Sequence, residues 1–156
     1  MNVTSNSKNN HNLSVNVQNK SYKDINNASF LTAIKDMDFK VPDGQFCCLL
    51  GPSGCGKTTL LNILSGLDKN YEGNIKFDGG SSPQNWAVGY MFQEPRLLPW
   101  LTVRQNVEIV TQQTSKDKDL SNSILETMGL SENMESFPSQ LSGGMQRRVA
   151  IARAFI

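Results

Sequence analysis

The stretch Gly51-Pro52-Ser53-Gly54-Cys55-Gly56-Lys57-Thr58-Thr59 matches the phosphate-binding loop pattern of glycine, four residues, glycine, lysine and then serine or threonine. Glycines carry no Cβ, so the backbone can curl and approach a ligand closely. The curl turns successive N–H groups inward and makes a concave anion site. Lys57 adds a charged donor for the β- and γ-phosphates, and Thr58 adds a hydroxyl for Mg²⁺. The stretch therefore predicts a site for nucleotide phosphates.

The sequence on both sides of the loop supports this interpretation. The continuous apolar run at residues 46–50 is typical of a parallel strand buried on both faces. After the loop, apolar residues recur at helical spacing; they are Leu60, Leu61, Ile63, Leu64 and Leu67. A helix that begins at the loop adds its N–H groups and its dipole to the anion site. A glycine-rich turn before an ordinary helix is the alternative, and it leaves this context unexplained.

Composition limits the classes of protein to consider. The 156 residues suffice for one domain, and the net charge of +1 creates no strong field toward nucleic acid or a membrane surface. No apolar stretch reaches the ~20 residues that span a bilayer, and no secretory signal is recognisable. Cys47, Cys48 and Cys55 have no metal-site or disulfide spacing, which favours a reducing cytosol. His11, the single histidine, lies in a polar tail and is a poor catalytic candidate.

The chain divides into a short tail and a larger domain. Residues 1–12 are rich in Asn, Ser and Lys, and we expect them to be disordered. Residues 13–156 form the expected domain. Alternating apolar and polar residues predict its strands. The first has Leu13, Val15 and Val17 as its apolar positions, and the second covers residues 30–41. An edge strand is expected at Ile75 and Phe77, and a further strand at Trp86, Val88 and Tyr90. Turns are expected at residues 24–27 and 78–80.

Helical patterns dominate the second half of the chain. The loop helix should end near Gly66. Helices are expected at 102–110, with Thr102 as N-cap, and at 120–128, stopped by Gly129, with a solvated mixed-charge turn at 116–119 between them. A last helix has an apolar face of Met145, Val149, Ala152 and Phe155. This order of elements suggests an α/β core with a small antiparallel β layer and a helical insertion.

A second motif lies at Leu141-Ser142-Gly143-Gly144-Met145-Gln146, followed by two arginines. Ser142 and two glycines open a helix, which makes another ready anion site, although an ordinary N-cap after a glycine turn has the same form. Together with the phosphate loop, these residues resemble the signature motif of ATP-binding cassette (ABC) proteins. Gln93 resembles the glutamine of their Q-loop, and Tyr22 lies where that family usually places an aromatic that stacks on adenine.

Residues 91–103, Met-Phe-Gln-Glu-Pro-Arg-Leu-Leu-Pro-Trp-Leu-Thr-Val, closely resemble one branch of ABC importers. That branch contains the ATPase subunits that serve nitrate, sulfonate, taurine and related small anions or precursors. The resemblance covers about residues 13–156. It implies the fold of a P-loop NTPase core with an N-terminal antiparallel β layer and a helical insertion.

The resemblance also implies how such subunits use ATP and Mg²⁺. Two subunits pair head to tail, and ATP lies between the phosphate loop of one and the signature of the other. Residues 51–59 and Tyr22 bind the nucleotide, Thr58 and Gln93 serve the metal, and residues 141–146 act in trans. The expected partners are a second copy, transmembrane permease subunits and, indirectly, a solute-binding protein, with the ATPase peripheral on the cytoplasmic face of the membrane.

An apolar cluster in a loop is a candidate for the permease contact: Leu97, Leu98, Pro99 and Trp100. Its functional interpretation is a docking surface for a cytoplasmic helix of the permease. Its alternative is a satellite cluster under the helical insertion. Both interpretations stay open at this point.

The chain departs from the family pattern at its end. Residue 156 falls inside the signature helix, before the strand that carries the Walker B aspartate and the catalytic glutamate, and before the switch histidine. No catalytic residue of the family is therefore found in this chain. We expect a truncated ATPase, part of a longer natural product, that is inactive by itself.

For the 156-residue chain itself we expect a binding-only module that holds nucleotide without turnover, because the glutamate is missing. Two other classes explain less of the sequence than an importer ATPase. An ABC-type ATPase of DNA maintenance needs long coiled-coil arms, whereas the segment between Thr59 and Leu141 is short and has no heptads. The nearly neutral charge also disfavours nucleic acid. A small-molecule P-loop kinase leaves the signature residues unexplained.

Overall fold

The computed structural model describes residues 12–23, 29–77, 87–111 and 114–156. They belong to two compact units, Met1–Ala87 and Val88–Ile156, and each unit has its own core. The expectations for residues 1–11, with His11, for the turns at 24–27 and 78–80, and for Trp86 lie outside the described residues. The single domain expected over residues 13–156 stays a prediction.

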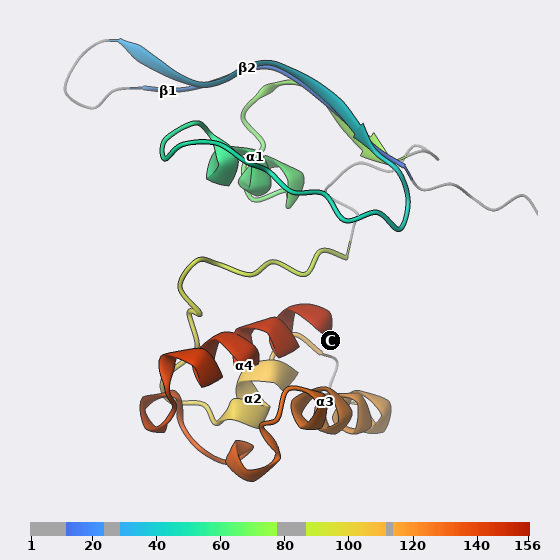
Figure 1. Cartoon of the computed structure of the whole chain (residues 1–156), viewed down its shortest axis with the longest axis vertical. Coiled ribbons are helices and arrows are strands. Elements are labelled where there is room, and N and C mark those ends of the chain that lie inside the picture. Colours follow the sequence, from blue (N-terminus) through green and yellow to red (C-terminus); the bar gives the residue numbers. More distant parts are fainter. Residues whose placement is uncertain (1–11, 24–28, 78–86, 112–113) are drawn as a thin grey trace, which may run out of the picture. The chain divides into compact units, whose positions relative to one another are not determined.

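The first unit is built on an antiparallel sheet. Its strands are β1 (Leu13–Lys23), β2 (Phe30–Val41) and β3 (Glu72–Phe77), in the order β2-β1-β3 (Figure 1). The strands predicted from alternation are confirmed here, and β3 is an edge strand as expected.

A shift in register changes which side chains of β1 face inward. Val15 and Val17 are buried two residues apart, but the next buried position, Lys20, follows after three residues. The pairing shifts between Val17 and Asn19 against β3, and between Lys20 and Ser21 against β2. An extra residue in a strand turns all the following side chains to the other face, so Lys20 and Tyr22 continue the inward row.

Helix α1 (Lys57–Leu64) covers the inner face of this sheet. Leu60 and Ile63, four and seven places after Gly56, are buried in one cluster with the valines of β1. The helix ends at Ser65, and Gly66 follows at φ 74°, the left-handed conformation that terminates helices. The predicted end of the loop helix is therefore confirmed.

The parallel strand expected at residues 46–50 is wrong. The segment has no strand pairing, and Phe46 and Leu50 are 94% and 88% exposed. A strand exists only where a neighbour pairs with its backbone, and among the described residues the sheet contains antiparallel strands alone. The alternation at Val88 and Tyr90 likewise forms no strand in the part of the chain that the structure describes.

The second unit is helical. Its elements are α2 (Val103–Glu108), α3 (Ser115–Thr127), two short 3₁₀ turns, η2 (Ser131–Asn133) and η3 (Pro138–Gln140), and α4 (Gly143–Phe155) (Figure 1). Buried side chains from all three helices share one core, including Val107, Leu125 and Val149. Thr102 is the N-cap of α2, as predicted, and the structure adds a reciprocal hydrogen bond with Gln105.

Two details of this unit differ from expectation. Residues 116–119 lie in α3, because Thr114 and Asp117 form a capping box that starts the helix earlier. Phe155, expected on the apolar face of the last helix, is exposed. Gly129 at φ 66° stops α3 as predicted. Among the described residues, no helix is long and apolar enough to cross a membrane.

Candidate functional site

The phosphate loop adopts a conformation that only glycines allow at two positions. Gly54 and Gly56 have φ of 82° and 90°, and Gly56 is the N-cap of α1. A Cβ on Gly56 would lie 2.5 Å from the carbonyl oxygen of Ala33 on β2. The loop is therefore held against the sheet by a backbone contact that excludes any side chain.

Lys57 lies across the inside of the loop. Its ammonium donates to the carbonyl oxygens of Gly51 and Pro52 at 2.8 and 2.7 Å, and Cys55 Sγ is 3.5 Å away. The charge is thus placed among the loop atoms that would surround a phosphate. An anion that binds here would find the ammonium already within the curve of the loop.

The start of α1 offers further groups for an anion and a metal. No side chain caps its N-terminus in the described part of the chain, so the first-turn amides suit an anion, and the first turn carries no acidic residue. Thr58, the predicted Mg²⁺ ligand, is exposed, as are Pro52 and Ser53, whereas Thr59 is partly buried. The donor set therefore fits a magnesium-bound phosphate chain.

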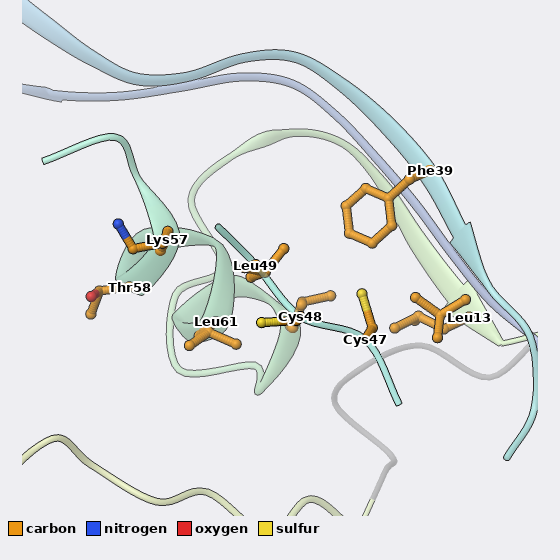
Figure 2. Close-up of a pocket in the computed structure, with 10 residues that line it drawn as sticks. Leu13, Phe39, Cys47, Cys48, Leu49, Lys57, Thr58 and Leu61 are labelled. Atoms are coloured by element: carbon orange, nitrogen blue, oxygen red, sulfur yellow. The ribbon is translucent and has the colours of Figure 1, made fainter. Parts of the chain in front are cut away.

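A cavity of about 480 Å³ lies beside the loop. Figure 2 shows Phe39 and Leu13 of the sheet facing Cys47 and Leu49, with Leu61 of α1 also lining the space. The cavity is bordered by the apolar run that was expected to form a buried strand. All three cysteines are exposed, in contrast to the buried pair that a strand implied.

Tyr22, the predicted adenine-stacking residue, is 40% exposed at the end of the inward row of β1. Its hydroxyl donates to Asp68 Oδ2 at 3.2 Å, and the Lys20 ammonium lies 4.5 Å from the ring centroid. Burial tends to raise the pKa of Asp68, but hydrogen bonds from Lys20, Asn70 and Tyr22 outweigh it and hold that pKa below its ordinary value.

Gln93 belongs to the second unit and is exposed in an irregular segment. The segment is fixed to α4, because Arg153 donates to the carbonyl oxygens of Pro95 and Arg96 at 2.8 and 3.1 Å. Burial lowers the pKa of Arg153. Since Thr58 lies in the other unit, a shared metal site of Thr58 and Gln93 stays a prediction.

The signature segment forms a capped helix start. Ser142 Oγ accepts a hydrogen bond from the Met145 N–H at 3.3 Å, so Ser142 is the N-cap of α4. Leu141 is buried, while Ser142, Gly143 and Gly144 are exposed. Gln146 donates to the carbonyl of Pro138 and so ties the helix to the preceding turn. The exposed glycines leave the helix start open to an approaching anion; its role in trans stays a prediction.

The apolar loop cluster divides into two parts. Leu97 packs against the core, whereas Trp100 is 69% exposed. Asn106, fully buried on α2, fixes the loop through bonds with the backbone N–H and C=O of Leu98 and with the carbonyl of Leu101. Leu97 thus behaves as a satellite of the core, Trp100 does not, and permease docking stays a prediction.

Sequence reasoning missed the residues that hold the predicted ones in place. Lys20 and Asp68 contact Tyr22, Asn106 holds the loop cluster, and Arg153 holds the segment after Gln93. A lysine in an alternating strand pattern suggests an exposed position, and only the bulge places it inside. Nowhere in the described ranges do three His, Cys, Asp or Glu side chains gather as a metal group.

Comparison with known proteins adds to this geometry. The family model described as "ABC transporter" matches residues 34–156. "Aliphatic sulfonates import ATP-binding protein SsuB" of Bacillus subtilis (strain 168) is 41% identical over 127 residues, covering 80% of this chain and 50% of that protein. The protein of the same name from Bacillus licheniformis is 40% identical over 148 residues, covering 92% and 56%. The chain thus spans about half the length of the curated relatives it matches.

Solved structures agree with the family match. A dimeric, post-hydrolysis structure of the ATP-binding cassette MJ0796 bound to ADP and Pi has a TM-score of 0.76 and 31% identity. The match covers 91% of this chain and 68% of that one. A second dimeric structure of MJ0796, described as a bacterial ABC transporter cassette, gives the same values. The expected α/β fold with an antiparallel β layer is thereby confirmed.

Proposed function

The chain belongs to the ABC transporter family, and on that premise we propose that it is the ATP-binding subunit of an importer for a small anion of the nitrate, sulfonate or taurine type. The observation that carries this proposal is the phosphate loop, with Gly56 against the sheet and the Lys57 ammonium inside the curve. The names of the relatives, which import aliphatic sulfonates, favour a sulfonate among these solutes.

Each group of the loop has a definite task in this proposal. The backbone N–H groups within residues 51–59 and the ammonium of Lys57 neutralise the phosphates, and the Thr58 hydroxyl would be a ligand of Mg²⁺, with Gln93 as the second proposed residue that serves the metal. The metal supplies positive charge that stabilises the transferred phosphoryl group. Tyr22 stacks on the adenine. Subunits of this family use such groups to hydrolyse ATP, and we assign the same activity to the proposed importer of which this chain is a part.

The site is completed by a second copy of the chain. Ser142, Gly143 and Gly144 are exposed at a helix start, so they suit the γ-phosphate of a nucleotide held by the partner. Neither copy alone surrounds the triphosphate, which makes nucleotide the link between them. The dimeric state of the similar cassette supports this assignment.

The permease contact is assigned to the loop around Trp100. Its ring is exposed and its backbone is fixed by Asn106, so a preformed apolar surface faces outward. A cytoplasmic helix of the permease is the proposed occupant. With this occupant we propose that the subunit is peripheral on the cytoplasmic face of the membrane and that a solute-binding protein acts indirectly.

Binding of MgATP by calorimetry tests the proposal. Lys57→Ala should weaken binding by about 10- to 100-fold, because a hydrogen-bonded charge contributes roughly 1.5–3 kcal/mol. Lys40→Ala, which removes an exposed lysine of β2, serves as the matched control and should bind like the wild type. Equal affinity of the Lys57 and Lys40 variants would refute the proposed phosphate site.

A further inference from the structure

We propose that Lys20 and Asp68 are positioning residues that hold the ring of Tyr22 as a platform for the adenine base. The inference rests on the proposed function, since it extends the same nucleotide site from the phosphates to the base. It concerns Lys20 and Asp68, two side chains to which the proposed phosphate site assigns no role.

The bulge in β1 is the first observation. Without the extra residue after Val17, a strict alternation would place Lys20 and Tyr22 on the outer face of the sheet. The register shift against β3 instead continues the inward row from Val17 to Lys20. The valines of this row pack against α1, the helix that the phosphate loop opens, and Tyr22 joins the row through its contact with Lys20.

The environment of Lys20 is the second observation. This lysine is only 3% exposed, and its ammonium has three donors to satisfy. It donates to Asp68 Oδ1 at 2.9 Å and to the Asn70 carbonyl at 2.6 Å, and the third electron-rich neighbour is the Tyr22 ring. A buried ammonium needs such partners, so the ring is part of what makes the burial possible.

Asp68 connects the same groups from the other side. It lies four residues after the end of α1, and it accepts bonds from Lys20, from the Tyr22 hydroxyl and from the Asn70 N–H at 3.0 Å. The side chain of Tyr22 is thus held at two places, by its hydroxyl and by one face of its ring. The segment after α1 therefore contacts Tyr22 through the carboxylate of Asp68, which accepts the hydrogen bond of the hydroxyl.

A held ring binds a base better than a mobile one. The exposed part of Tyr22 can stack on an aromatic ligand, while the ammonium occupies the ring from its own side. Because the rotamer is fixed before binding, less side-chain entropy is lost when the base arrives. Lys20 and Asp68 then contribute to affinity for the base and leave affinity for the phosphates unchanged.

Comparison of two ligands separates this role from simple stabilisation. Calorimetry on the full 156-residue chain measures MgATP and, separately, magnesium tripolyphosphate, which has the phosphates without adenosine. Tyr22→Ala should weaken MgATP by about ten-fold, which is what an aromatic contact of roughly 1.5 kcal/mol gives, with tripolyphosphate unaffected.

Lys20→Met and Asp68→Asn are the variants that decide the matter. Each should weaken MgATP by roughly three- to ten-fold and leave tripolyphosphate within two-fold of the wild type. Lys35→Met, an exposed lysine on β2, is the matched control and should change neither affinity. Asp68→Asn keeps the shape of the side chain, so it remains informative if Lys20→Met lowers the melting temperature.

The outcomes are distinct. A lower melting temperature with an unchanged ratio of the two affinities would overturn the positioning role and leave the phosphate site intact. An unchanged ratio in Tyr22→Ala would overturn the platform itself. Binding of neither ligand by the wild-type chain would overturn the proposed function and the inference together.

Discussion

The phosphate loop and the signature segment are both glycine-bearing helix starts, but their surroundings differ. The signature helix α4 follows a compact turn: Leu141 is buried, Ser142 caps the helix, and Val149 and Ala152 fill a core. The phosphate loop follows residues 46–50, an apolar run that is exposed except at the partly buried Leu49 and that pairs with no described strand. The two starts thus share a local motif and differ in their long-range contacts.

The difference shows which structure a short segment determines by itself. A capped helix satisfies its backbone within a few residues, so α4 needs only a nearby core. A parallel strand needs partners from distant parts of a chain. Residues 46–50 have the composition of such a strand, and the described residues contain no neighbour that could pair with them.

Hydrogen exchange should give the largest contrast between these two regions. Backbone amides of residues 46–50 should exchange nearly as fast as in an unfolded chain, whereas those of residues 147–152 in α4 should be slowed by on the order of 10³-fold or more. The reason is that only the helix amides are bonded within a packed element. Exchange measured by mass spectrometry on peptides from both regions checks this.

Thiol labelling supplies the control for that measurement. Cys47 and Cys48 should react with an exposed-thiol reagent at the same rate in native and denaturing buffer. Strong protection of the amides and of both thiols would show that the run is paired after all, and the contrast between the two regions would disappear.

Gly56→Ala should cause a large loss of stability in the first unit. The new Cβ would lie 2.5 Å from the Ala33 carbonyl at a φ of 90°, which combines overpacking with left-handed strain. Together these effects should lower the free energy of unfolding by roughly 2–4 kcal/mol. Urea denaturation followed by circular dichroism measures the change.

The signature segment offers the matched substitution. Gly143→Ala places a Cβ where no atom lies within 4 Å, and its φ is not positive, so stability should change by less than about 1 kcal/mol. Equal losses in the two variants would mean that the phosphate loop is not held against β2 as described.

Asn106→Ala should be the next largest effect, and it concerns the second unit. The side chain is fully buried and serves backbone groups of Leu98, Leu101 and Thr102, which would lose their partner. A loss of roughly 2–3 kcal/mol follows from buried groups left unsatisfied. Asn16→Ala, which removes one bond to Asp38 at the surface, should cost less than about 0.5 kcal/mol in the same denaturation experiment.

The elements predictable from the sequence are those with local causes. Alternation gave β1, β2 and β3, and the caps at Thr102 and Ser142 gave the starts of α2 and α4. The strand expected at residues 46–50 is wrong, because apolar composition does not supply the distant partner strand that pairing needs. The turn expected at 116–119 is wrong, because the Thr114 cap starts α3 before these residues.

The candidate site follows the same rule. The phosphate loop and the signature are contiguous motifs, so their residues could be named from the sequence. The contacts of Tyr22 could not, because they need a bulge in β1 and a carboxylate 46 residues away. Likewise Arg153 reaches carbonyls 57 and 58 residues before it, which no spacing rule indicates.

The smallest effect should be the dependence of stability on acid at the Lys20–Asp68 pair, which belongs to the first unit. The folded-state pKa of Asp68 is lowered: burial acts to raise it, and the bonds from Lys20, Asn70 and Tyr22 outweigh burial. Its stabilising contribution is thus fully present above the ordinary aspartate pKa of about 3.9 and is lost as the pH falls through the lower, folded value.

The melting temperature of the wild type should consequently fall more steeply with acid than that of Asp68→Asn, measured from pH 6 to pH 2. Asp119→Asn, at an exposed carboxylate of α3, controls for the loss of a negative charge alone. A slope in Asp68→Asn equal to that of the wild type would mean that the carboxylate does not hold Lys20 and Tyr22 in the folded chain.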